Sequence, residues 1–216
     1  RLTFIADPSG QRTGDPPGPV MVTGAEPIDE TIFPPGDAPG VYVAALPGYR
    51  VWGVVEMDGP QRRFARADNT KEFLVDKVPE VAVVARLRAT FAYDEGSGEL
   101  TLHTSDDRPP SAHEIEILRR GAGFLLVGRH YVTVTGFTFR HMQDAGISFF
   151  KGSGDGIASD NVSYGSRQGI RVYDAPNVLV YGNTLFRNEN SGVYFAAQST
   201  NSAALRNVSY ENLKGL

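Results

Sequence analysis

The chain has 216 residues, of which 41% are hydrophobic, and carries a formal net charge of −4 at pH 7. Its length suits one large or two small domains with a real core, whereas its negative charge argues against binding to nucleic-acid phosphates, which requires a basic face. It has no cysteine, which excludes disulfide bonds and thiolate chemistry, and it has no apolar run of about 18 residues that could insert into a membrane.

Residues 1–40 are rich in proline and glycine. Residues 2–6 and 20–24 have strand-like sequences, and the segment between them is typical of a loop. The family resemblance given below implies that residues 1–28 form an early coil of the repeat, which the chain then leaves in residues 29–40.

Residues 41–118 interrupt that repeat and are predicted to form an inserted β-rich subdomain. Asp58-Gly59 is a strong hairpin signal between strand-like residues 51–57 and 61–67. Residues 94–98 are a second turn signal, between strands at 91–93 and 99–103. Residues 81–89 fit either a strand or a helix, because a β-branched apolar run is followed by Arg-Leu-Arg-Ala.

Residues 119–216 contain a regular repeat. Four glycines, each followed by an apolar residue, are spaced 23 residues apart: Gly146, Gly169, Gly192 and Gly215. An aromatic residue closes each strand-like run before the next glycine: Phe139, Tyr164, Phe186 and Tyr210. Three residues before each aromatic lies Gly136, Asn161, Asn183 or Asn207. Two markers that share one period in the twenties predict a stacked array.

The repeat units alternate in polarity as strands do. Ile147 and Phe149 are expected to point inward, and Ser148 and Phe150 outward. The repeated asparagines predict a ladder of stacked side-chain amides, with glycine and asparagine at the corners. One unit per turn, with several short strands per unit, is typical of a parallel β-helix.

From about Tyr131 onward, the chain resembles the right-handed parallel β-helix repeats of the pectate-lyase-like superfamily. Residues 132–139 (VTVTGFTF), 177–188 (NVLVYGNTLFRN) and 191–195 (SGVYF) carry the resemblance. Asp58-Gly59, Ala65-Arg66 and residues 93–100 are similar to the small β-rich insertion of some bacterial β-helix glycoside hydrolases. The resemblance implies an all-β, right-handed parallel β-helix with an inserted antiparallel β subdomain. Many members are secreted lyases, glycoside hydrolases or epimerases, and others are adhesins or tail fibres.

Stacking would place equivalent residues of adjacent coils about 4.8 Å apart. Three outward columns are then predicted: Ser148, Arg171, Tyr194; Phe150, Tyr173, Ala196; and Lys151, Asp174, Ala197. Aromatic rings stack on sugar faces, and charged groups bind hydroxyls or uronate groups. The candidate substrate-binding residues are therefore Phe150, Lys151, Arg171, Tyr173 and Tyr194. In the alternative interpretation, a loop or neighbouring domain covers this face and its aromatics belong to a core.

Glycoside hydrolysis requires two carboxylates, about 5 Å apart for retention and about 6.5–9.5 Å apart for inversion. The acid–base candidates of the array are Asp144, Asp155, Asp160, Asp174, Glu189, Glu211 and His141. Asp174 lies beside the predicted patch, and Asp144 and His141 precede the first Gly-Ile strand, so we select these three as catalytic candidates. Lyase chemistry would instead use Arg171 or Lys151. For any single candidate, a structural or solvated role is the favoured alternative.

The sequence predicts no metal or cofactor. The four histidines (103, 113, 130 and 141) lack metal-ligand spacing. Residues 7–15 and 94–98 offer oxygen ligands suited to Ca²⁺, but neither matches the spacing of a known calcium loop.

Together these features predict a carbohydrate-active protein, extracellular or periplasmic, with a poly- or oligosaccharide bound across the face of the Gly-Ile strands. A glycoside hydrolase is favoured, and a polysaccharide lyase or a non-catalytic glycan-binding or adhesin-type β-helix are the alternatives. Arg1 begins within a strand and Leu216 occupies the first core position of a coil. We therefore expect further coils beyond one or both ends.

Overall fold

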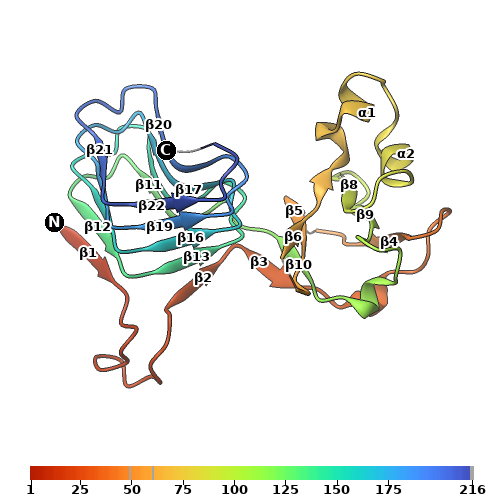
Figure 1. Ribbon diagram of the computed structural model, residues 1–216, viewed down its shortest axis with the longest axis horizontal. Helices are drawn as coiled ribbons and strands as arrows, with labels where there is room; N and C mark the ends of the chain where they lie inside the picture. Colours follow the sequence, from red (N-terminus) through yellow and green to blue (C-terminus); the bar gives the residue numbers. More distant parts are fainter. Residues whose placement is uncertain (49, 60, 215–216) are drawn as a thin grey trace. The chain divides into compact units, whose positions relative to one another are not determined.

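The computed structural model describes residues 1–48, 50–59 and 61–214 (Figure 1). It divides into two compact units: a coiled unit, Arg1–Gly24 with Arg120–Leu216, and an inserted unit, Ala25–Arg119. No helix among the described residues is long and apolar enough to cross a membrane.

The coiled unit is built from three sheets of parallel strands, and successive coils add one strand to each sheet. The first sheet contains β1 (Leu2–Ile5), β12 (Val132–Thr135), β15 (Ile157–Ser159), β18 (Leu179–Tyr181) and β21 (Ala203–Leu205). The second contains β2 (Met21–Thr23), β13 (Thr138–Arg140), β16 (Val162–Tyr164), β19 (Thr184–Phe186) and β22 (Val208–Tyr210). The third, called here the long-strand sheet, contains β11 (Ala122–Val127), β14 (Ala145–Phe150), β17 (Gln168–Tyr173) and β20 (Ser191–Ala196). This is the predicted parallel β-helix.

The glycine column explains the period of 23 residues. β14, β17 and β20 pair so that Gly146, Gly169 and Gly192 lie in one row. A Cβ atom added at Gly169 would lie only 2.5 Å from the carbonyl oxygen of Gly192. The row also includes Gly123 of β11, which the sequence analysis did not identify. Gly215, the last predicted member, lies outside the described residues.

The amide ladder is confirmed. Asn161 Nδ2 donates to Asn183 Oδ1 at 3.0 Å, and Asn183 Nδ2 donates to Asn207 Oδ1 at 2.9 Å. A second ladder follows β19, where Asn188 Nδ2 donates to Asn212 Oδ1 at 3.0 Å. Each of these asparagine amides also bonds backbone groups, so none of the ladder amides among the described residues is left unpaired.

The predicted aromatic row needs one correction. The rings of Tyr164, Phe186 and Tyr210 stack at centroid distances of 4.9 and 5.0 Å. Arg140, however, and not Phe139, pairs with Tyr164, and Phe139 is completely buried. Phe139 is wrongly assigned to the row, because a shift of one residue turns a side chain to the opposite face of the strand.

The inserted unit contains two sheets and two short helices. One sheet has the order β3 (Ala25–Pro27), β10 (Ile115–Leu118), β5 (Gly53–Glu56), β6 (Arg62–Arg63), and all its pairs are antiparallel. The other has the order β4 (Val41–Ala45), β9 (Glu99–His103), β8 (Thr90–Asp94), β7 (Ala65–Arg66), and only β7 and β8 are parallel. The helical elements are η1 (Glu30–Ile32), η2 (Ala67–Asn69), α1 (Lys71–Leu74), α2 (Glu80–Val84) and η3 (Pro110–Ala112).

Both predicted hairpins are present, β5 with β6 and β8 with β9. The ambiguous segment 81–89 begins as helix α2, and the predicted single strand 61–67 is divided between the two sheets. The unit begins at Ala25 rather than at residue 41, because β3 pairs with β10 and the buried Phe33 belongs to this unit's core.

Candidate functional site

The outward face of the long-strand sheet carries the predicted columns. Arg171 pairs with Ser148 and Tyr194 in the adjacent strands, and Tyr173 pairs with Phe150 and Ala196. β11 adds Leu125 and Val127 to the same two columns, with 60% and 47% of their surfaces exposed. The face therefore presents apolar and aromatic side chains from four consecutive coils.

Arg171 is the centre of this face. Its guanidinium carbon lies 4.6 Å from the ring centroid of Phe150 and 5.0 Å from that of Tyr173. The two rings are 5.3 Å apart and tilted by 42°. Arg171 Nη1 donates to Asp144 Oδ2 at 2.6 Å, and both side chains are mostly buried. A cation between two rings and a carboxylate holds all four side chains in one geometry.

Two polar atoms of this face lack a hydrogen-bond partner among the described residues. They are Ser148 Oγ and Arg171 Nε, both buried. Buried polar groups are normally paired, so these two atoms are among the exceptions in the described residues.

The corner after these strands carries the third predicted column. Lys151, Asp174 and Ala197 occupy equivalent positions and have positive φ values of 38°, 50° and 54°. Lys151 Nζ lies 5.2 Å from the Phe150 ring centroid. The half-buried Asp174 carboxylate has no hydrogen-bond or ion-pair partner among the described residues, and is thus available to a ligand.

The structure brings Asp144 into the cluster but not His141. His141 is 1% exposed, and its ring packs edge-on against Tyr164 of the second sheet at 6.0 Å. Asp144 precedes the first residue of β14, and Asp174 follows the last residue of β17. The backbones of these two candidates therefore lie at opposite ends of the six-residue strands.

The remaining acidic candidates have other partners or places. Asp155 accepts from Asn177 Nδ2 at 3.1 Å and lies 3.1 Å from His130 Nδ1. Glu211 is ion-paired with Arg187 at 2.6 Å on the exposed surface. Asp155 and Asp160 both have positive φ, as expected for residues at corners. None of these three side chains belongs to the cluster of Asp144 and Arg171.

The inserted unit contains a cluster that the sequence analysis missed. His113 is buried, with Nδ1 2.6 Å from Asp58 Oδ2 and Nε2 3.1 Å from Asp106 Oδ1. Glu56, Asp58 and His113 offer ligand atoms that all lie within 4.8 Å of one another. The pKa of Asp58 lies below its usual value: partial burial acts to raise it, but hydrogen bonds from the Glu114 N–H and from His113 outweigh that effect. No spacing rule connects residues 55 positions apart, so the sequence holds no signal for this cluster.

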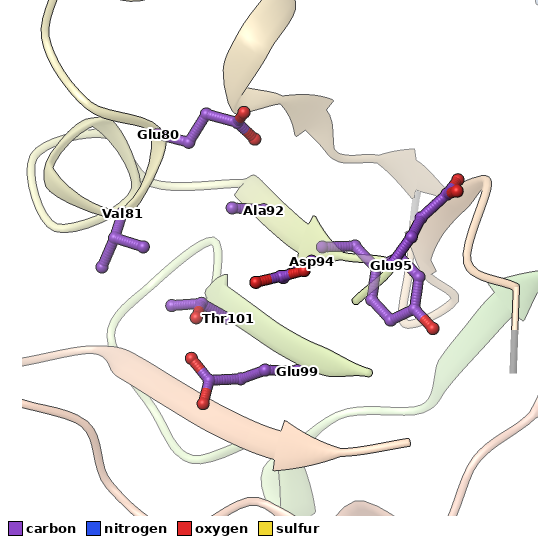
Figure 2. A pocket seen from close by; sticks show the side chains of 8 residues that line it. Glu80, Val81, Ala92, Asp94, Glu95, Glu99 and Thr101 are labelled. Carbon is purple, nitrogen blue, oxygen red and sulfur yellow. The ribbon is translucent and has the colours of Figure 1, made fainter. Parts of the chain in front are cut away.

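An acidic cavity of about 400 Å³ also lies in the inserted unit, between α2 and the β8–β9 hairpin (Figure 2). Its lining residues are Glu80, Val81, Ala92, Tyr93, Asp94, Glu95, Glu99 and Thr101. Partial burial, aided by the charge of Asp68, raises the pKa of Glu80. No residue of the predicted site lines this cavity.

A sequence model described as the right handed beta helix region matches residues 102–216. This chain belongs to the right-handed β-helix family. The match covers the whole array, so the coils of Figure 1 are those of a right-handed β-helix. No curated protein matches the sequence.

One solved structure with the same fold is "The complex structure of XylC with xylose". It aligns over all of this β-helix chain and 54% of that chain, with a TM-score of 0.54 and 12% sequence identity. This chain therefore spans about half the length of XylC, and the likeness at this identity is one of fold alone.

Proposed function

We propose that this β-helix protein binds a poly- or oligosaccharide along the outward face of the long-strand sheet and hydrolyses a glycosidic bond there. The observation that carries the proposal is the cluster of Phe150, Arg171, Tyr173 and Asp144. Two neighbouring rings, 5.3 Å apart, offer apolar area to sugar faces, and the guanidinium and carboxylate offer charge-assisted hydrogen bonds to hydroxyls. XylC, which has the same fold, was solved with xylose, so xylo-oligosaccharides are the first ligands to test.

The two carboxylates would have different roles. Asp144 is held by the Arg171 guanidinium, and an ion-paired carboxylate suits a nucleophile or base better than a proton donor. Asp174, which has no partner among the described residues, is the other carboxylate of the face, but it lies at the far end of the strands and cannot act on the same glycosidic bond as Asp144. Hydrolysis at Asp144 would need a proton donor closer to it. Because such a protein meets its polymer outside the cytoplasm, we propose an extracellular or periplasmic location.

Binding without catalysis is the second candidate function. The observation that favours it is the separation of Asp144 and Asp174 at opposite ends of the strands, since a hydrolase needs its carboxylates within about 10 Å. A lyase is less well supported, because Arg171 is committed to Asp144 and a guanidinium does not lose its proton in proteins.

Calorimetric titration with xylo-oligosaccharides and a panel of plant and microbial glycans tests the binding face. We expect Tyr173→Ala and Arg171→Ala each to weaken binding by about tenfold or more, since stacking and charge-assisted bonds each contribute about 1–2 kcal/mol. Arg187→Ala is the control, because Arg187, in the corner after β19 of the second sheet, has an equally short ion pair of 2.6 Å. Unchanged affinity in both face variants would rule out this face.

Product release by the same variants tests hydrolysis. We expect Asp144→Asn to lower turnover by about 100-fold or more and also to weaken glycan binding, because Asp144 holds Arg171 in the binding cluster. If the unmodified protein binds a glycan on this face but releases no product from it, binding alone is the function.

A further inference from the structure

The His113 cluster lies where three segments of the inserted unit meet. Glu56 ends β5, Asp58 lies in the turn before β6, and His113 follows η3 just before β10. The pairing of β5 with β10 sets this arrangement, since Ile115 lies directly opposite Glu56. Asp106 reaches the imidazole from the loop after β9.

The hydrogen bonds of His113 define the roles of its two nitrogens. Nε2 lies 3.1 Å from a carboxylate oxygen of Asp106, which can only accept, so Nε2 carries a proton. Nδ1 faces two further carboxylate oxygens, Asp58 Oδ2 at 2.6 Å and Glu56 Oε2 at 3.7 Å. A neutral imidazole would turn a lone pair towards both oxygens. At 2.6 Å, the contact between Nδ1 and Asp58 Oδ2 is a hydrogen bond, and a metal ion bound by both atoms at about 2.0–2.2 Å would need the contact to open to about 3 Å.

The two carboxylates are oriented as metal ligands are. Glu56 Oε1 accepts from Ser105 Oγ at 2.5 Å, and Oε2, which faces His113 Nδ1 at 3.7 Å, accepts a longer hydrogen bond from the Ser105 N–H at 3.4 Å. Asp58 Oδ1 accepts from the Glu114 N–H at 2.5 Å, which leaves Oδ2 directed to the same point. In metal sites, hydrogen-bonding groups around the ligands typically orient them. These groups bond one oxygen of each carboxylate ligand and the nitrogen of the histidine that does not bind the metal.

Burial makes a compensating charge necessary. The side chains of His113 and Glu56 are 1% and 7% exposed, so an ionised Glu56 without a nearby cation would be costly. Asp58, at 37%, is exposed enough to give an ion access and to widen the 2.6 Å contact by rotating.

We propose that Glu56, Asp58 and His113 bind one divalent transition-metal ion, Zn²⁺ or Mn²⁺, through Oε2, Oδ2 and Nδ1, and that Asp106 orients the imidazole. One nitrogen and two oxygen ligands suit these ions. Ca²⁺ is a poor match, because it takes about six to eight oxygen ligands and these residues supply two carboxylates and a nitrogen. The ion would tie the β5–β6 turn to the segments on either side of η3, and so stabilise the inserted unit.

Titration of the chelator-treated full chain with ZnCl₂, MnCl₂ and CaCl₂ tests the proposal. We expect calorimetry to give one Zn²⁺ or Mn²⁺ per chain, and the Tm reported by Trp52 fluorescence to rise by about 5 °C or more at saturation. Trp52 is the chain's one tryptophan and belongs to the inserted unit. Electron paramagnetic resonance of bound Mn²⁺ should show coupling to an imidazole nitrogen, which requires no variant. No binding tighter than about 1 mM would mean that the cation is a proton, and would overturn the proposal.

Substitutions locate the ion. We expect Glu56→Gln to weaken metal binding by about 100-fold, and Asp106→Asn by about 10–100-fold. Asp107→Asn is the matched control: Asp107 accepts from buried His103 Nε2 at 2.8 Å, but the other nitrogen of His103 faces the Val84 carbonyl oxygen. Equal weakening by Glu56→Gln and Asp107→Asn, or a Mn²⁺ spectrum without nitrogen coupling, would place the metal elsewhere and overturn the proposal.

Discussion

At the scale of single residues, the close approach of backbones decides which positions tolerate a side chain. Gly169 is not required for its φ. A Cβ there would lie 2.5 Å from Gly192 O and 3.0 Å from Leu185 Cδ2. The oxygen belongs to the neighbouring coil, whose position is set by a parallel ladder, so it cannot move away locally.

Gly169→Ala should therefore lower the free energy of unfolding by at least about 2 kcal/mol, as overpacking of a rigid interior does. Gly121→Ala is the control, because a Cβ at Gly121 meets no atom within 4 Å and the backbone is not left-handed. Chemical denaturation of both variants measures the difference. Equal stability would mean that the coils separate readily at this row.

At the scale of elements, the side-chain ladders join the coils at their corners. Asn183 is completely buried and accepts from both the backbone N–H and the Nδ2 of Asn161, each at 3.0 Å. Its own Nδ2 donates to Ala158 O at 2.9 Å and to Asn207 Oδ1 at 2.9 Å. Removing this amide leaves several buried polar groups without a hydrogen-bond partner. Each unpaired group costs about 1–3 kcal/mol.

Asn183→Ala should thus destabilise the protein by about 3 kcal/mol or more. A double-mutant cycle with Asn161→Ala should be strongly non-additive, because the second substitution removes a partner that is already lost. Asn161→Ala with Asn188→Ala is the additive control, since Asn188 bonds Asn212 and Ser163 and shares no partner with Asn161. Additivity in both cycles, measured by urea denaturation, would show that the ladder is not a cooperative element.

At the scale of the whole molecule, the two ends of the inserted segment lie next to each other. Arg120 N–H donates to Gly24 O at 3.1 Å, and Ala25 pairs with Leu118 across β3 and β10. Each unit has its own core: Phe139, Ile147 and Val180 lie in one, and Phe33 and Leu102 in the other. Insertions whose ends are adjacent are well tolerated by a host domain.

Joining Gly24 to Arg120 through a short Gly-Ser linker should therefore preserve the β-helix. We expect β-type far-UV circular dichroism and a single cooperative thermal transition within a few degrees of that of the intact chain's coiled unit. Residues 25–119 alone should keep the Trp52 emission of the intact protein. Loss of cooperative unfolding in both pieces would mean that the two cores depend on each other.

The sequence alone determined the coil, because the neighbours of a β-helix residue lie at a nearly constant distance along the chain. Gly146, Gly169 and Gly192, the asparagine ladder and the columns around Arg171 could all be predicted from that one period. The prediction is wrong at Phe139, where the period shifts by one residue and the side chain points inward.

The tertiary structure decided what lies between distant, non-periodic residues. Only packing brings Asp144 to Arg171, buries His141 against Tyr164, and places His113 between Asp58 and Asp106. It also decided that the inserted unit begins at Ala25, through the pairing of β3 with β10. Such contacts depend on where loops return and which side chains fit together. A local pattern of residue types predicts neither the path of a loop nor the fit of distant side chains. Stacked strands can be predicted, because every coil repeats the same local geometry.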